Sequence, residues 1–248
     1  MPIAIVTGGN SGIGRAITAR LAKDGFDVGF TWHREEERAR EAEQEVAGHG
    51  RRAVSRHADL HDVEAGARTI EKLAGELGGI DVLVNNAGYG SDTPFYEMEL
   101  DEWRGVIEVN LTGAFMCAKA ATRRMLDQGR GGRIINVTSV HEHIPMDGSA
   151  PYTSSKHGLG GFTKVAAIEL AEHGITVNAV APGQIATRMT GQEDQEPEPS
   201  EGIPLGRAGE AHEIAGAVAF LAGPDGSYVT GESLVIDGGL RHIAARHQ

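Results

Sequence analysis

The sequence predicts an α/β protein built on a doubly wound, seven-stranded parallel sheet with helices on both faces. Short runs rich in β-branched residues alternate with stretches of helical periodicity, and this alternation is typical of strand–helix–strand units. Several runs, such as IAIVT and DVLVN, are almost continuously apolar, as expected of strands covered on both faces. Glycine accounts for 35 of the 248 residues, which indicates a backbone with many tight turns or close approaches.

Strands and helices alternate along the whole chain, without a linker or an internal repeat that would divide it. We therefore expect a single domain over residues 1–248. The runs with strand composition lie at residues 3–7, 27–31, 52–55, 81–85, 133–138, 176–181 and 233–236. The stretches with helical periodicity lie at residues 12–24, 35–48, 62–77, 100–128, 152–173 and 211–223.

The segment 188–201, RMTGQEDQEPEPSE, breaks this alternation because it is acidic, contains proline and has few apolar residues. It follows the sixth predicted strand, where a loop can cover a site at the strand ends. We interpret it as a mobile lid over the substrate. A solvated loop without a function is the alternative.

Composition and charge argue against several classes of protein. The formal net charge of −12 disfavours nucleic acid, whose binding relies on clustered Lys and Arg. Cys117 is the only cysteine, so no internal disulfide can form. No apolar run approaches the ~18 residues of a membrane span, and no signal peptide is expected at the start of the sequence. A cytoplasmic protein is the expectation.

A glycine-rich turn, TGGNSGIG at residues 7–14, follows the first predicted strand and opens the first predicted helix. Backbone N–H groups at a helix N-terminus bind anions, and glycines let a pyrophosphate approach the main chain. The spacing differs from the common G-x-G-x-x-G, and a tight turn without a ligand is the alternative. The predicted cofactor contacts in this turn are Gly8, Asn10, Ser11, Gly12, Ile13 and Gly14.

The residues after the second predicted strand bear on the choice of cofactor. Dinucleotide folds often place an acid here, which hydrogen-bonds the adenosine ribose. This chain has His33 and Arg34 instead, and no acid before Glu35. Cationic side chains pair with a 2′-phosphate that an acid would repel, so NADP(H) is favoured. NAD(H) stays possible, because Arg34 can equally belong to the solvated start of the next helix.

Four polar residues form a candidate catalytic group. Tyr152 and Lys156 are four residues apart in a predicted helix, so they share one face. A phenol has an ordinary pKa near ~10, and a neighbouring ammonium moves that pKa toward the working range of a general acid–base. Ser139 ends the fifth strand, where α/β sheets open ligand crevices, and Asn110 lies in a long helix. Singly, each is more often structural; together with the glycine turn they indicate a site.

The combination resembles the short-chain dehydrogenase/reductase family over nearly the whole chain. The resemblance implies a single-domain Rossmann fold and hydride transfer between the nicotinamide of NAD(P) and a carbon that carries oxygen. It also implies a homotetramer. The matching segments are TGGNSGIG at 7–14, Asp59-Leu60, NNAG at 85–88, Asn110, Ser139, Tyr152-x3-Lys156, PGQIAT at 182–187 and IDGG at 236–239.

The resemblance also implies a role for each matching residue. Tyr152 is the general acid in carbonyl reduction and the base in alcohol oxidation, while Lys156 lowers its pKa and binds the nicotinamide ribose. Ser139 positions the substrate oxygen, and Asn110 holds a water in a proton relay to Lys156. The other implied cofactor contacts are Asp59 and Leu60 by the adenine, Asn86, Ala87 and Gly88 by the adenosine ribose, and Pro182, Gly183, Ile185 and Thr187 by the nicotinamide.

The substrate is the least determined part of the prediction. The segment SVHEHIP is similar to one in bacterial glucose dehydrogenases of the family, so a sugar or polyol is the alternative to a small ketone, aldehyde or secondary alcohol. His141 and Tyr89 are the predicted substrate contacts, and Tyr89 with Phe95 suggests a partly apolar pocket. His141 and His143 would share one side of an extended segment, but a third ligand is missing, so no metal is expected. A non-catalytic dinucleotide-binding regulatory protein is a second alternative, and it should have lost part of the catalytic group.

Overall fold

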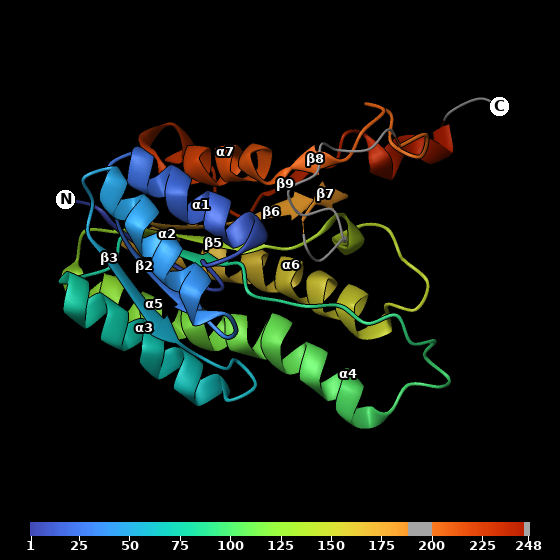
Figure 1. The fold of residues 1–248 in the computed structure, drawn as a ribbon, viewed down its shortest axis with the longest axis horizontal. Coiled ribbons are helices and arrows are strands. Elements are labelled where there is room, and N and C mark those ends of the chain that lie inside the picture. Colours follow the sequence, from blue (N-terminus) through green and yellow to red (C-terminus); the bar gives the residue numbers. More distant parts are fainter. Residues whose placement is uncertain (188–199, 246–248) are drawn as a thin grey trace.

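A seven-stranded parallel sheet forms the centre of the molecule (Figure 1). The computed structural model describes residues 1–187 and 200–245. The strand order is β3-β2-β1-β4-β5-β6-β9, in which each neighbouring pair is parallel. The predicted fold class is therefore confirmed. The strands are β1 (Ile3–Val6), β2 (Asp27–Trp32), β3 (Ala53–His57), β4 (Val82–Asn85), β5 (Gly132–Val137), β6 (Ile175–Pro182) and β9 (Ser233–Ile236).

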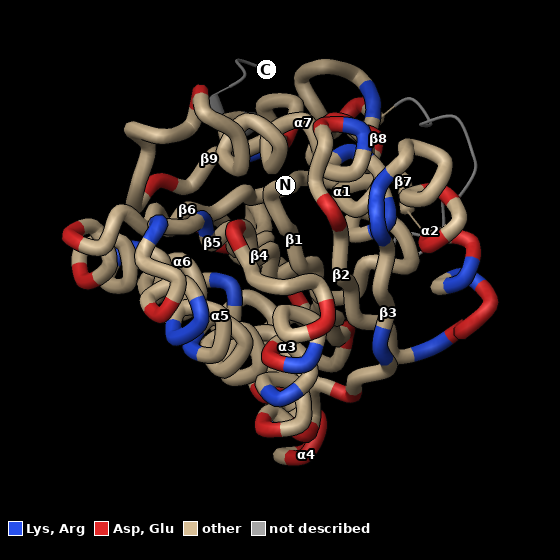
Figure 2. Tube along the Cα trace, turned by 90° about the vertical axis from the view of Figure 1, so that its left-hand side faces the viewer, with Lys and Arg blue, Asp and Glu red and all other residues tan. Residues whose placement is uncertain are grey.

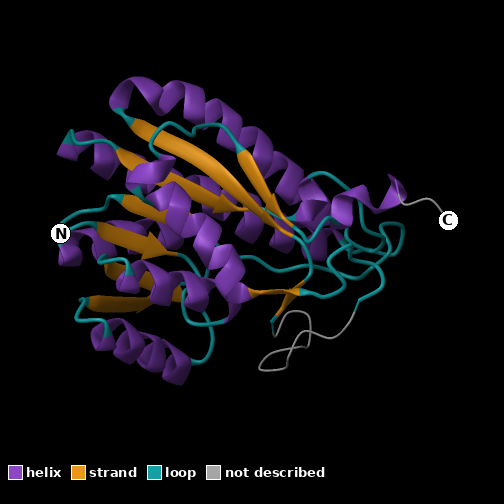
Figure 3. Ribbon diagram, turned by 90° about the horizontal axis from the view of Figure 1, so that it is seen from above, coloured by secondary structure: helices purple, strands orange, loops and turns teal. Residues whose placement is uncertain are grey.

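Helices cover both faces of the sheet, as the alternation of elements requires. One layer holds α1 (Gly12–Lys23), α2 (Glu36–Gly48) and α7 (Ala211–Ala222), with α1 packed between the other two. The other layer holds α3 (Val63–Leu77), α5 (Ala114–Gln128) and α6 (Ala150–Leu170). Figure 3 shows the strands pointing toward the end of the molecule where the loops gather. The carboxyl ends of the strands therefore face this loop-rich end.

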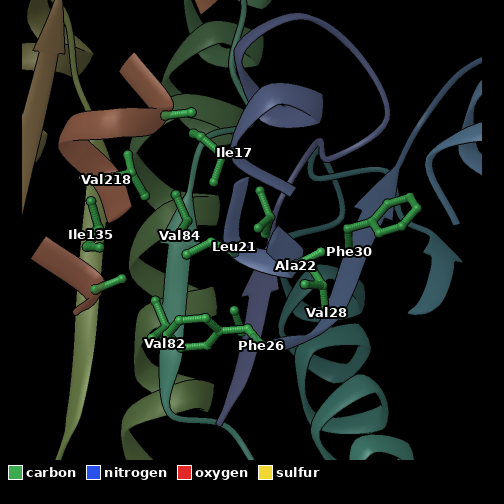
Figure 4. Packing of buried hydrophobic residues seen from close by; sticks show 14 of the residues in the cluster. Ile17, Leu21, Ala22, Phe26, Val28, Phe30, Val82, Val84, Ile135 and Val218 are labelled. Carbon is green, nitrogen blue, oxygen red and sulfur yellow. The ribbon is translucent and has the colours of Figure 1, made fainter. Parts of the chain in front are cut away.

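Apolar side chains fill the space between the sheet and its helices. Figure 4 shows the cluster beneath α1 and α7, where Leu21 and Val218 approach Val84 and Ile135 of the sheet. Phe30 of β2 is completely buried in the same cluster. Fully burying one such side chain contributes about 1.5–3 kcal/mol. This packing fixes the sheet on which the loops of the candidate site are mounted.

The predicted helix 100–128 is divided by a π-helical turn. An α-helix, α4 (Leu100–Ile107), is followed by the turn Glu108–Gly113 and then by α5. A π turn inserts one residue into the helical repeat, and such turns are frequent at functional sites. Here the turn contains Asn110, one of the predicted catalytic residues.

The segment after Ser139 also differs from the prediction. Residues Val140–Glu142 form a 3₁₀ turn instead of an extended segment. With three residues per turn, side chains two positions apart point in different directions. The expectation that His141 and His143 share one side was therefore wrong. A two-stranded pair of β7 (Ile185–Ala186) and β8 (Gly209–Glu210) was not predicted.

The charged residues lie mainly on the outer elements. Figure 2 shows tan central strands surrounded by helices on which blue and red segments are interspersed. In the described part of the chain, no helix has the length and apolar character needed to cross a membrane. The predicted lid, 188–201, lies outside the described residues except for its last two positions.

Candidate active site

One cleft of about 780 Å³ runs across the carboxyl ends of the strands. Its walls come from residues that follow β1 to β6 and from the start of α6. In open α/β sheets, ligands bind in this crevice at the strand ends. Most of the predicted site residues line it, namely Gly8, Asn10, Ser11, Gly12, Ile13, Gly14, His33, Arg34, Asp59, Leu60, Asn86, Ala87, Gly88, Tyr89, Ser139, Tyr152, Lys156, Pro182, Gly183, Ile185 and Thr187.

The glycine turn brings bare backbone to the surface of the cleft. Gly8 and Gly12 have φ angles of +66° and +51°, which L side chains rarely adopt. At Gly14, a methyl group would overlap the carbonyl oxygen of Gly8. The turn leads directly into the N-terminus of α1, whose first N–H groups are available to an anion. This cradle fits the pyrophosphate of a dinucleotide.

Polar side chains that the sequence analysis did not single out hold this turn in place. Thr7 Oγ1 accepts hydrogen bonds from the backbone N–H groups of Asn86 (2.9 Å) and Ala87 (3.0 Å). Thr31 Oγ1 accepts from the N–H of Gly8 at 3.1 Å. Thr7 directly follows the buried strand β1 and Thr31 lies near the end of the buried strand β2, and this position is the only signal that the sequence offers for them. They link three strand ends around the turn.

Two predicted cofactor contacts, Asn86 and Asn10, donate hydrogen bonds from their side-chain amides to the protein backbone. Asn86 Nδ2 donates to the backbone oxygens of Thr7 (3.0 Å) and Gly8 (3.2 Å). Asn10 Nδ2 donates to the backbone oxygen of Arg34 at 2.9 Å. Asn10 thereby joins the glycine turn to the loop after β2. The position of Arg34 in the cleft thus depends on Asn10.

The loops after β2 and β3 form one end of the cleft. This end holds a cluster of His33, Asp59 and His61. Asp59 accepts hydrogen bonds from His61, from both the backbone N–H (3.0 Å) and Nδ1 (2.8 Å). These bonds and the nearby His33 lower the pKa of the Asp59 carboxyl. Tyr89 places its hydroxyl 3.2 Å from His61 Nε2, so its side chain lies at this end. The predicted contact between Tyr89 and the substrate is not tested by this arrangement.

Ser139 and Tyr152 meet at the other end of the cleft. Ser139 lies two residues after β5, is 5% exposed, and its hydroxyl lies near enough to Tyr152 to influence the phenol. Burial raises the pKa of the Tyr152 phenol, and the Ser139 hydroxyl lowers it by less. The expectation of a lowered phenol pKa is therefore not met in this structure, because desolvation dominates.

Lys156 is almost completely buried, one helical turn after Tyr152. Its Nζ donates to the backbone oxygen of Val137 at 2.9 Å and lies 5.5 Å from the centre of the Tyr152 ring. Burial lowers the pKa of the Lys156 ammonium to about 8, and the negative charge of Glu142 opposes that change. The lysine therefore holds its proton weakly beside the phenol.

Asn110 lies behind the wall of the cleft and contacts its backbone. Its Oδ1 accepts from the N–H of Tyr89 (3.0 Å), and its Nδ2 donates to the oxygen of Tyr89 (2.9 Å) and to Ser155 Oγ (3.2 Å). A methyl group at Gly88 would lie 3.0 Å from Asn110 Oδ1 and 3.5 Å from Lys156 Nζ. The π-helical turn thus brings Asn110 close to the lysine, and the water relay itself stays a prediction.

The loop after β6 forms part of the cleft wall and reaches the glycine turn. Gly183 packs so closely on Asp237 that a methyl group there would lie 2.7 Å from its Cα. Ile185 and Thr187 are buried, and Thr187 Cγ2 would lie 3.7 Å from a methyl group at Gly12. These residues and Pro182 border the part of the cleft that holds Ser139 and Tyr152.

His141 contacts Tyr152 of the candidate catalytic group, whereas Phe95 does not line the cleft. His141 packs edge-on against Tyr152 with 6.2 Å between ring centres, and its Nδ1 lies 3.1 Å from the oxygen of Ile144. Phe95 is 77% exposed and packs on Tyr96, so the expectation that it lines the pocket was wrong. Among the residues that the structure describes, no group of three or more His, Cys, Asp or Glu is arranged to hold a metal ion.

This cleft and its fold match known proteins over almost the whole chain. The family model described as enoyl-(acyl carrier protein) reductase matches residues 8–241. The "uncharacterized oxidoreductase YohF" of Escherichia coli is 50% identical over 240 residues, which are 96% of this chain and 95% of that protein. The chain belongs to the short-chain dehydrogenase/reductase family. The resemblance seen in the sequence is thereby confirmed.

Two further relatives of this short-chain dehydrogenase/reductase have a substrate in their names. The crystal structure of "acetoin dehydrogenase YohF" from Salmonella typhimurium matches with a TM-score of 0.95 and 48% identity, over 100% of this chain and 98% of its own. "Glucose 1-dehydrogenase 2" of Bacillus subtilis is 38% identical over 241 residues, 96% of this chain and 93% of that protein. The present chain is accordingly an NAD(P)-dependent oxidoreductase, as predicted.

Proposed function

We propose that this enzyme reduces small ketones and aldehydes to alcohols, and catalyses the reverse oxidation, with NADP(H) as the preferred cofactor. The observation that carries the proposal is that Ser139, Tyr152 and the buried Lys156 line the cleft together, with Lys156 Nζ 5.5 Å from the centre of the Tyr152 ring, at the opposite end from Arg34. The name of the Salmonella relative makes an acetoin-type hydroxyketone, or the corresponding diketone, the first substrate to test.

The proposed chemistry divides the work between cofactor and protein. When bound, the nicotinamide supplies or accepts the hydride at the carbon that carries oxygen. The glycine turn holds the pyrophosphate, Lys156 holds the nicotinamide ribose, and Ile185 with Thr187 holds the carboxamide. Ser139 donates a hydrogen bond to the substrate oxygen and positions it against Tyr152.

Tyr152 is the proposed proton donor in reduction and the proton acceptor in oxidation. Its raised pKa suits the reduction direction, because the phenol must carry its proton when it meets the substrate oxygen. In oxidation, the Lys156 ammonium beside the ring favours the phenolate. Asn110 is proposed to hold the water through which Lys156 exchanges protons with the solvent.

The preference for NADP(H) is proposed from the loop after β2. His33 and Arg34 line the cleft and are exposed, so their side chains are available to a 2′-phosphate. We further propose a cytoplasmic homotetramer of single-domain subunits. Phe115 on α5 and Val165 and Ile168 on α6 are exposed apolar side chains, which suit subunit contacts on these helices.

A substrate panel tests this function. The purified enzyme should reduce diacetyl, acetoin and simple ketones or aldehydes, with a higher kcat/KM for NADPH than for NADH. The reverse reaction is measured with secondary alcohols, glucose and polyols. A higher kcat/KM for glucose than for the carbonyl compounds would favour the second candidate, a sugar dehydrogenase, which the Bacillus relative supports. Cofactor binding without turnover on the whole panel would contradict both.

A further inference from the structure

A buried carboxylate beside the proposed catalytic group has no part in the mechanism above. Glu142 closes the 3₁₀ turn that begins directly after Ser139, and it is only 7% exposed. Its Oε2 accepts a hydrogen bond from Ser233 Oγ of β9 at 2.9 Å. The carboxylate therefore joins the turn of Ser139 to the far edge strand of the sheet.

Helix α6 leaves space for this carboxylate. A methyl group at Gly160 would overlap the carboxyl group of Glu142, so a side chain there would displace it. Gly160 lies four residues after Lys156, which places both on one face of the helix. The Glu142 carboxylate therefore lies against the same face of α6 as Lys156, one helical turn further along the helix.

A buried charge is costly unless an opposite charge compensates for it. The charge of Glu142 acts on Lys156, whose pKa it raises against the opposing effect of burial. The other titratable residues on the neighbouring elements are Tyr152, His157 and the exposed Lys164 and Glu169 on α6, His141 and His143 around the turn, and Glu232 before β9. Glu232 and His143 are exposed, so their charges are better screened by water than that of Glu142.

We propose that Glu142 is a positioning residue that keeps Lys156 in its ammonium form and fixes the turn of Ser139 against β9. The proposal rests on the proposed function, in which Lys156 binds the nicotinamide ribose and acts on Tyr152. Glu142 itself is not among the residues that line the cleft.

Glu142→Gln tests the proposal, because the amide oxygen can still accept from Ser233 while the charge is lost. Removing a negative charge lowers the pKa of a neighbouring ammonium, so Lys156 loses its proton more readily. The alkaline limb of kcat for carbonyl reduction should move by about one pH unit to lower pH. The pH at which NADPH affinity weakens, measured by nicotinamide fluorescence, should move in the same direction.

Two further variants separate charge from structure. Glu142→Asp keeps the charge and should restore the alkaline limb toward that of the wild type. Glu232→Gln removes an exposed charge next to Ser233 and should leave the limb unchanged. Thermal unfolding of each variant checks that it is folded.

The outcomes distinguish this proposal from the function on which it rests. If the wild type reduces no carbonyl compound of the panel, the proposed function fails. An active wild type with a Glu142→Gln variant that melts earlier but keeps both pH profiles would show a purely structural role and overturn the proposal. A shifted profile in Glu142→Gln that Glu142→Asp does not restore would also overturn it.

Discussion

The phenol of Tyr152 is subject to two opposing influences, burial that favours its protonated form and the Ser139 hydroxyl that favours the phenolate. Replacing it with phenylalanine removes the proton donor and leaves the ring. We expect Tyr152→Phe to lower kcat for ketone reduction by at least ~10²-fold, the contribution of a general acid–base residue. NADPH affinity, measured by fluorescence, should change little because the ring is retained.

Tyr96→Phe is the matched control for this experiment. Tyr96 is 74% exposed, packs on the ring of Phe95 and does not line the cleft. The same loss of one hydroxyl should leave kcat unchanged. Near-normal turnover of Tyr152→Phe would refute its assignment as proton donor.

Arg34 permits a test of cofactor preference at a single residue. Its backbone is fixed by Asn10, and its exposed side chain borders the cleft. Hydrogen bonds to charged groups contribute about 1.5–3 kcal/mol, so we expect Arg34→Ala to weaken NADPH binding about tenfold or more. NADH lacks the 2′-phosphate, and its affinity should change much less.

Arg40→Ala controls for the loss of a positive charge. Arg40 is exposed on α2 and pairs with Glu36 at 2.7 Å, away from the lining of the cleft. It should not alter the ratio of NADPH to NADH affinity. An equal loss for both cofactors in Arg34→Ala would remove the proposed phosphate contact.

At the scale of elements, the turn between β1 and α1 depends on the missing side chain of Gly14. A methyl group there would overlap the oxygen of Gly8, and backbone cannot yield as a flexible side chain can. Overpacking of this kind costs about 1–3 kcal/mol. We expect Gly14→Ala to lower the denaturant midpoint and to abolish measurable NADPH binding.

Gly48→Ala provides the control, since Gly48 ends α2 with open space around its Cα. Alanine is the better helix former, so this variant should be as stable as the wild type or slightly more stable. A Gly14→Ala protein with normal stability and normal affinity would show that the turn does not need its close contact.

The longer elements could be predicted from sequence because each one shows many repeats of its period. The seven apolar runs correspond to the seven strands of the sheet, with small differences at their ends. The π-helical turn at Glu108–Gly113 could not be predicted, because it inserts one residue into a pattern that otherwise stays helical. The strands β7 and β8 are two residues long and show no period at all.

Site residues whose type implies their chemistry could be predicted from the sequence. Contacts and pKa shifts that depend on packing could not. The glycine turn, Ser139 and Lys156 line one cleft as expected. The raised pKa of Tyr152 depends on burial, which spacing along a helix does not reveal. The supporting role of Asn10 likewise depends on a contact with a loop 24 residues away in sequence.

At the scale of the whole molecule, Cys117 reports whether the chain is folded. It is completely buried, and desolvation raises the pKa of its thiol to about 12. Only the thiolate reacts with disulfide reagents, so at pH 8 the native protein should react about 10³-fold more slowly than an ordinary thiol. Labelling with Ellman's reagent, with and without denaturant, measures this. Fast labelling of the native protein would contradict the packing of α5 on α3.

The cleft is assembled from the ends of six strands, so it exists only when the sheet is complete. A dinucleotide that binds this cleft binds the native state and not the unfolded chain. Binding to the native state alone stabilises it by about 2.7 kcal/mol at a cofactor concentration 100 times Kd. Melting curves with and without NADPH should show this increase, and an unchanged Tm would contradict it. Inside a cell, the supply of dinucleotide would then set the fraction of chains open to proteolysis, and so the lifetime of the enzyme.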